Sequence, residues 1–244
     1  MLKKSFFSFV IVLIFIVGAN AQTRIGITAG YNLSGVHGVT GIFSGNSSFN
    51  HDWSMVSGFQ AGIAGEFPLN EAETFYLQAA GTFYSHGFRD TYNQGSPNGS
   101  TARRTFKFYG LQVPVNVQYK LKVGIPVIVF QAGPYVDYEM FGRQKYTLNN
   151  KDKTSSLSDA QKKLKFEETS NQKIKNRFQY GVGVGAGVQV SRFQVMLGYN
   201  YGLSDLAFYK KTGITYDHKL KSNQFFANFT FYFGKYASIF PDIE

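Results

Sequence analysis

The sequence predicts an all-β protein, an eight-stranded antiparallel up-and-down transmembrane β-barrel, and three observations favour this fold class. Eight segments alternate apolar and polar residues with the period of a β-strand. The connections between these segments are alternately long and short. The N-terminus has the features of a secretory leader, and no later stretch is long and apolar enough to predict a membrane-spanning helix.

Residues 1–21 have the pattern of a signal peptide. A lysine pair at residues 3–4 precedes an almost wholly apolar run at residues 6–17, and residues 19–21 (Ala-Asn-Ala) form a small-x-small cleavage site. The apolar run is shorter than the ~20 residues that a spanning helix needs. We therefore expect cleavage after Ala21, with an uncleaved anchor helix as the alternative.

The eight predicted strands follow the leader and together cover most of the chain. Each is at least as long as the ~9–11 residues with which a tilted strand crosses a bilayer. One face of each segment is apolar, and the other carries amides, hydroxyls and glycines. In chain order the segments are residues 24–36, 55–67, 74–85, 105–120, 125–141, 177–190, 193–203 and 223–233.

The polar faces of these strands contain few charges, which separates two kinds of β-protein. A soluble barrel exposes its polar face to water, where Lys, Glu and Asp are common. Uncharged amides instead suit a narrow barrel interior in which side chains bond to one another, with the apolar face toward lipid. The amides are Gln60, Gln78, Gln112, Asn116, Gln118, Gln131, Gln179, Gln189, Gln194, Asn200, Gln224 and Asn228.

The lengths of the connections predict how the barrel is oriented. Outer-membrane barrels have short periplasmic turns and long external loops. We therefore expect a barrel at residues 22–234 in the bacterial outer membrane, periplasmic termini, and a dispensable periplasmic tail at residues 235–244. The long connections are Gly38–Ser54, His86–Arg104, Gly142–Asn176 and Ser204–Ser222, and the short ones are Pro68–Glu73, Leu121–Gly124 and Ser191–Arg192.

The net charge of the chain indicates which class of partner it would attract. The 244 residues suit one domain, contain no cysteine and have a net charge of +10, which suits acidic lipid head groups. Residues 143–175 hold nine basic and four acidic residues, and a capping pattern there predicts a short helix at residues 159–168. This loop is either a dock for anionic lipid sugars or a partner protein, or a solvated loop. It lacks the interleaved aromatics of a nucleic-acid site.

Five charged residues are expected to face the barrel interior. A buried charge has to be paired, so we expect them to belong to a polar network inside the barrel. They are Glu66, Lys120, Asp137, Glu139 and Arg177.

Motifs for catalysis, metals or cofactors are weak, so we expect a non-enzymatic protein without a cofactor. Ser85 and His86 are adjacent, and adjacent strand residues point to opposite faces. The glycines of residues 181–187 alternate within a strand with no helix after them, which favours room inside a narrow barrel over a phosphate loop. The histidines lack metal-ligand spacing and are expected to be solvated loop residues: His37, His51, His86 and His218.

Four segments, taken in order, resemble the PorT-type outer-membrane β-barrel family. This family consists of small barrels without agreed catalytic residues, and its founding member is linked to a system that exports proteins across the outer membrane. The resemblance implies a scaffold or a component of a secretion or assembly system. A narrow porin-like channel, a surface adhesin and a soluble lipocalin-like binder remain as alternatives. The segments are Tyr109–Tyr119, Ala132–Val136, Tyr180–Gly187 and Gly198–Ser204.

Overall fold

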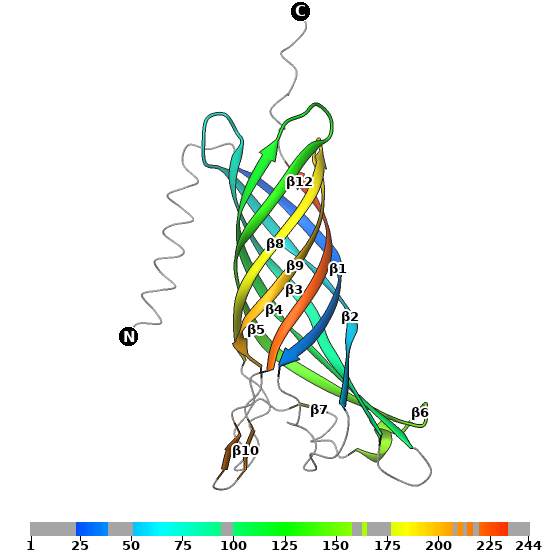
Figure 1. Cartoon of the computed structure of the whole chain (residues 1–244). Coiled ribbons are helices and arrows are strands. Elements are labelled where there is room, and N and C mark those ends of the chain that lie inside the picture. Colours follow the sequence, from blue (N-terminus) through cyan, green and yellow to red (C-terminus); the bar gives the residue numbers. More distant parts are fainter. Residues whose placement is uncertain are drawn as a thin grey trace, which may run out of the picture.

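The chain forms a closed β-barrel in a computed structural model that describes residues 23–38, 51–93, 100–157, 163–164, 177–206, 209–211, 214–216 and 220–233. Eight long antiparallel strands make the barrel wall (Figure 1). They are β1 (Arg24–Gly38), β2 (His51–Pro68), β3 (Phe75–Asn93), β4 (Thr101–Leu121), β5 (Val127–Leu148), β8 (Phe178–Val190), β9 (Phe193–Asp205) and β12 (Leu220–Phe233).

Each barrel strand pairs with the next one along the chain, and the last strand pairs with the first. The closing ladder runs without interruption from the pair Ile25 and Phe233 to the pair Gly38 and Leu220. Closure leaves no open strand edge around the wall, which is the condition for placing a sheet in lipid. The predicted fold class, an eight-stranded up-and-down barrel, is confirmed.

The alternation seen in the sequence separates the two faces of the wall. Large apolar side chains are exposed on the outside, as at Ile63 and Leu197, which are 64% and 62% accessible. Amides are buried inside, as at Gln118 and Gln194, both 0% accessible. This partition is the reverse of that in a water-soluble protein and is favourable only where hydrocarbon surrounds the barrel.

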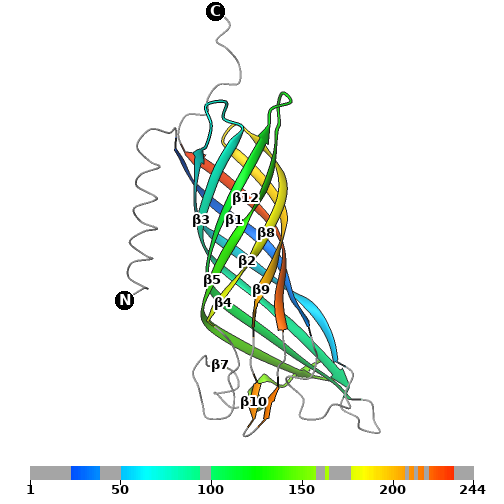
Figure 2. The ribbon, with the colours of Figure 1, turned by 60° about the vertical axis from the view of Figure 1, so that its left-hand side comes forward.

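Short and long connections lie at opposite ends of the barrel. The turns after β2, β4 and β8 share one end with the start of β1 and the end of β12 (Figure 2). The tightest of them consists of Ser191 and Arg192, and Ser191 adopts a φ of 52°. We name the two ends the turn end and the loop end. The predicted signal peptide and the predicted tail at residues 235–244 lie outside the described residues.

Four strands continue past the rest of the barrel at the loop end, which corrects one prediction. The connection expected at residues 86–104 is mostly strand, because β3 reaches Asn93 and β4 begins at Thr101. The paired segments β2 (51–55), β3 (88–93), β4 (101–106) and β5 (144–148) form a sheet that we name the extension (Figures 1 and 2). The charged residues in these segments led to the prediction of a loop. They are compatible with strands here because this part of the sheet is not bounded by lipid.

The described parts of the long loops contain short β-structure. β6 (Lys151–Asp152), the turn η1 (Thr154–Ser156) and β7 (Lys163–Leu164) follow β5, while β10 (Tyr209–Lys211) and β11 (Ile214–Tyr216) form a hairpin. The helix predicted at residues 159–168 is wrong at its centre, since β7 pairs with β5 there. Its other residues lie outside the described ranges.

Helices contribute little to the described fold. Within the described ranges, no helix is long and apolar enough to cross a membrane.

We predict that the wall tolerates arginine only near its rims. Val115→Arg and Ala186→Arg are each expected to lower the free energy of unfolding by ~2–4 kcal/mol, because both side chains point outward at the middle of their strands. Val190→Arg, at the turn end of β8, is the matched control and should cost ~0–1 kcal/mol. Gln118→Ala, inside the barrel, should cost ~1 kcal/mol.

Denaturant titration in lipid vesicles measures these differences. Equal costs for arginine at Val115, Ala186 and Val190 would contradict a lipid-facing wall.

Candidate functional site

The barrel interior is the candidate site, because the buried polar and charged side chains gather there. It has four levels along the barrel axis, from the turn end to the loop end: an ionic cluster, an amide-lined cavity, a carboxylate cluster and an apolar cluster. The first and third levels contain four of the five charged residues that the sequence predicted to face inward: Glu66, Lys120, Asp137 and Glu139.

The ionic cluster lies at the turn end and is centred on Glu66 of β2. Glu66 Oε1 accepts hydrogen bonds from both the guanidinium of Arg24 and the ammonium of Lys120. Lys120 Nζ also donates to Gln189 Oε1 at 2.7 Å. Glu66 is fully buried, and a buried carboxylate of this kind is stabilised by its two cationic donors.

Two tyrosines enclose the ionic cluster. The Arg24 guanidinium lies 5.6 Å from the ring centroid of Tyr76 and 5.4 Å from that of Tyr232, and Lys120 Nζ lies 4.1 Å from the Tyr76 ring. The Tyr232 hydroxyl accepts a bond from Gln78 Nε2 at 3.0 Å. Cation–π contacts and hydrogen bonds thus hold both cations in place, and the cluster fills the turn-end mouth.

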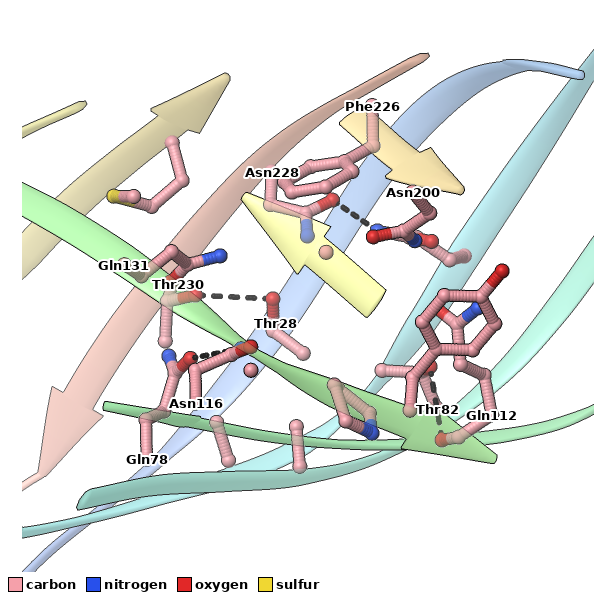
Figure 3. Close-up of a pocket in the computed structure, with 18 residues that line it drawn as sticks. Thr28, Gln78, Thr82, Gln112, Asn116, Gln131, Asn200, Phe226, Asn228 and Thr230 are labelled. Atoms are coloured by element: carbon pink, nitrogen blue, oxygen red, sulfur yellow. Dashed lines mark hydrogen bonds between the residues drawn. The ribbon is translucent and has the colours of Figure 1, made fainter. Parts of the chain in front are cut away.

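The second level is a cavity of about 40 Å³ lined by amides, hydroxyls and small residues, together with Tyr135, Met196 and Phe226 (Figure 3). Thr230 Oγ1 donates to Thr28 Oγ1 at 3.0 Å, and Asn116 Nδ2 donates to the side chain of Gln78 at 3.3 Å. Gln60 Nε2 of β2 donates to Asn228 Oδ1 of β12 over Gly30 of the intervening strand β1. A volume of this size has room for only a few waters. The side chains therefore largely bond to one another, as the uncharged polar faces predicted.

Glycines in β8 make this level compact. A Cβ at Gly181 would lie 2.5 Å from the Tyr135 hydroxyl, and one at Gly183 would lie 2.4 Å from Asn200 Oδ1. Interior side chains from β5 and β9 therefore occupy the space that a larger residue would need. This is the packing role that the sequence favoured for residues 181–187 over a phosphate loop.

The third level is a carboxylate cluster centred on Glu139 of β5. Glu139 Oε1 accepts bonds from the Tyr84 hydroxyl at 3.1 Å and from Gln179 Nε2 at 2.8 Å, and it contacts His86 Nε2. Asp137, two residues earlier on the same face of the strand, is also buried. Side chains from β3, β5 and β8 therefore converge on one carboxylate near the loop end.

The position of His86 corrects the expectation that the histidines are solvated loop residues. β3 continues through residue 86, and its even-numbered positions there face the lumen, so His86 is buried against Glu139. His37 also lies in a strand, β1, and stacks on Tyr201 with ring centroids 4.9 Å apart. His51 begins β2, and His218 lies outside the described residues.

Ser85 and His86 have separate partners, although both are buried. The Ser85 hydroxyl accepts the backbone N–H of Phe59 at 3.0 Å, whereas His86 contacts Glu139. In the part of the chain that the structure describes, no three His, Asp or Glu side chains lie close enough together to hold a metal ion.

The fourth level is an apolar cluster that covers the carboxylate cluster at the loop end. The rings of Phe88 and Phe106 stack with centroids 4.9 Å apart, and Phe108 lies 5.6 Å from the ring of His86. The strand pattern of the sequence does not indicate this cluster, because most of its residues lie in segments predicted to be loops. Its members are Phe88, Phe106, Phe108, Leu206 and Leu220, with Val36 and Trp53 packed against them.

The five charged residues predicted to face inward are thus placed in separate groups rather than in one network. Glu66 and Lys120 meet at the turn end, and Asp137 and Glu139 lie near the loop end. Arg177 is half-buried just before β8, where its carbonyl oxygen accepts the backbone N–H of Glu139 at 2.8 Å.

Arg24, Tyr84 and His86 are among the interior residues that the sequence pattern did not single out, as are Asp90, Tyr76 and Tyr232. For Arg24 the signal was present, because it has the same strand parity as the inward-facing Thr28.

Comparison with known proteins gives one family match and several solved structures of low sequence identity. No curated protein sequence matches the chain. Solved structures that it resembles include Ail of Yersinia pestis (15% identity, TM-score 0.37, 87% of this chain and 99% of that one covered). OprG of Pseudomonas aeruginosa is 12% identical with a TM-score of 0.41, covering 89% of this chain and 98% of that one. Neisserial surface protein A is 15% identical with a TM-score of 0.36, covering 86% and 97%.

A family model described as an outer membrane protein beta-barrel domain matches residues 20–207, which is most of the chain. The matched range includes seven of the eight barrel strands. The chain therefore belongs to the outer-membrane β-barrel domain family.

Proposed function

We propose that this protein is a closed, non-enzymatic barrel of the bacterial outer membrane that acts as a scaffold or a component of a protein secretion or assembly system. The observation that carries the proposal is the filled lumen. The ionic cluster occupies the turn-end mouth, the apolar cluster covers the loop end, and the cavity between them measures about 40 Å³. A barrel filled in this way is suited to holding a surface in the membrane rather than to passing solutes.

The surface that the barrel would hold in the membrane for a partner protein is the extension at the loop end. A sheet that continues past the barrel rim offers backbone and side chains beyond the bilayer, where a partner protein has access to them. The four segments that resemble the PorT-type family lie in β4, β5, β8 and β9, which are neighbours in the ring. This continuous half of the wall supports assignment to the PorT-type family.

The arrangement of the carboxylate cluster supports a non-enzymatic role. Tyr84, His86 and Gln179 all contact the same oxygen of Glu139, beneath the apolar cluster. A substrate would have to displace packed aromatic rings to reach His86. Packing of the barrel and closure of its mouth are the functions that this geometry serves best.

A narrow solute channel is the second candidate, and the amide-lined cavity is the observation that favours it. The parent protein is expected to show no conductance steps in planar bilayers. Phe88→Ala, Phe106→Ala and Lys120→Ala combined should raise conductance above background, because these changes open both closures.

Heat-dependent migration on gels checks that the triple variant is folded. Steady conductance of the parent protein would overturn the closed-barrel proposal in favour of the channel.

The proposed orientation places the termini and the turn end in the periplasm. It is testable because the chain contains no cysteine. We expect Lys153→Cys, near η1, to react with a membrane-impermeant maleimide on intact cells. Leu69→Cys, in an exposed turn at the other end, should react only after the outer membrane is permeabilised. The opposite labelling pattern would show that the barrel is inverted.

The proposed role in secretion predicts a cellular effect. Cells that lack this protein should release less of the proteins exported across the outer membrane, and the parent protein should restore their release. Mass spectrometry of the medium, with periplasmic proteins measured as a leakage control, detects the change. Unchanged export in cells without the protein would leave the adhesin as the better assignment.

A further inference from the structure

The outward face of the extension, together with the adjoining residues of β4 and β5, is strongly basic. Arg89 of β3, Arg103 and Lys107 of β4, and Arg143 and Lys145 of β5 alternate along their strands with the residues of the inner face, among them the buried Phe88 and Phe106. Strand parity therefore places all five basic side chains on one side of the sheet. We name these five residues the basic face.

Two members of the basic face are direct cross-strand partners. Lys107 lies opposite Arg143, and on its other side Arg143 has Lys163 of β7 as its register partner. Like charges placed directly opposite each other destabilise a sheet. An anion bound between them would turn this repulsion into attraction.

Acidic residues near the basic face compensate only one of its charges. Lys145 Nζ lies 3.1 Å from Asp152 Oδ2. Hydrogen bonds from the Thr154 hydroxyl and backbone N–H, with Lys145 beside it, lower the pKa of Asp152 to about 2, so this carboxylate stays charged. Asp52 is exposed, and its register partner is the uncharged Thr91.

The other four basic side chains have no acidic partner within the described residues. Arg89 Nε donates only to the hydroxyl of Thr105, at 3.4 Å. Arg103, Lys107 and Arg143 form no ion pair there. The basic face therefore carries an excess of positive charge that the described protein does not neutralise.

The position of the basic face along the barrel wall indicates which anion neutralises its positive charge. On the same outward face, the rings of Phe83, Tyr109 and Phe141 form a stacked row, with centroids 6.5 Å apart for the first pair and 4.9 Å apart for the second. Aromatic girdles of this kind mark the edge of the apolar belt. Lys107 and Arg143 follow two residues further along each strand, a rise of ~7 Å. This is the level of lipid head groups.

We propose that the basic face binds phosphate groups on the glycolipid of the outer leaflet. The proposal goes beyond the scaffold function and rests on the orientation proposed above. Charge complementarity favours a phosphate ligand, since Arg and Lys donate to phosphate with charge-assisted hydrogen bonds. Continuity with the aromatic row favours a lipid source, because a lipid whose chains pack on the apolar belt has its head group at Lys107 and Arg143.

The test is titration with bisphosphorylated lipid A, followed by native mass spectrometry in a neutral detergent. The double variant Lys107→Gln/Arg143→Gln should bind about thirty-fold more weakly than the parent protein. The matched control is Lys151→Gln/Lys153→Gln, which removes the same charge from exposed positions that follow β5 and lie outside the basic face. It should bind like the parent. Dephosphorylated lipid A should bind no better to the parent than to the double variant.

Stability in detergent separates a binding role from a structural one. Without phosphate lipid, Lys107→Gln/Arg143→Gln should unfold at the same temperature as the parent or higher, because a like-charge pair is removed. With lipid A, the parent should become the more stable of the two. A variant that is less stable without lipid and unchanged in lipid A affinity would overturn the proposal.

A soluble polyanion is the alternative occupant. Dextran sulfate is the probe for it, and binding of dextran sulfate that depends on Lys107 and Arg143, with lipid A binding unaffected, would also overturn the proposal. Cysteine labelling keeps the two proposals distinguishable. An inverted labelling pattern combined with intact lipid A binding would refute the orientation and leave an anion site.

Discussion

Backbone hydrogen bonding in hydrocarbon is the constraint on which this structure depends. No water is available in the bilayer core, so every strand edge has to be paired, and a sheet meets that condition only by closing on itself. The uninterrupted ladder between β1 and β12 provides the closure here. The even number of strands and the division into a turn end and a loop end both follow from an up-and-down ring.

Closure with eight strands then determines the chemistry of the interior. A ring of this size leaves a lumen just wide enough for side chains, so polar groups that point inward bond mainly to one another. Glu66 with its two cationic donors and Glu139 with its three polar contacts are the charged examples. A cavity of about 40 Å³ is what remains between them. Polar side chains thus fill the barrel and form hydrogen bonds with one another at the same time.

Beyond the membrane the constraint no longer applies, and the structure changes accordingly. β2, β3, β4 and β5 continue past the rim as an open sheet, and its inner face packs Phe88 and Phe106 over the mouth. The outer face of the same strands changes from aromatic to basic residues at Lys107 and Arg143. This change in residue type therefore marks the level along the sheet at which hydrocarbon ends and charged head groups begin.

The sequence by itself determined the fold class, the number of strands and which side of each strand faces lipid, because alternation with period two is a local property of the chain. It also identified Glu66, Lys120, Asp137 and Glu139 as inward-facing charges by strand parity, and the same parity would have included Arg24. Only the tertiary structure decided how these charges are grouped, because strand register brings together residues as distant as Arg24, Glu66 and Lys120. The ends of the strands at residues 86–104, the burial of His86 and the apolar cluster were also decided there. Outside the bilayer, the alternation of apolar and polar residues no longer distinguishes a strand from a loop. Hydrogen bonding with neighbouring strands then determines which of the two forms.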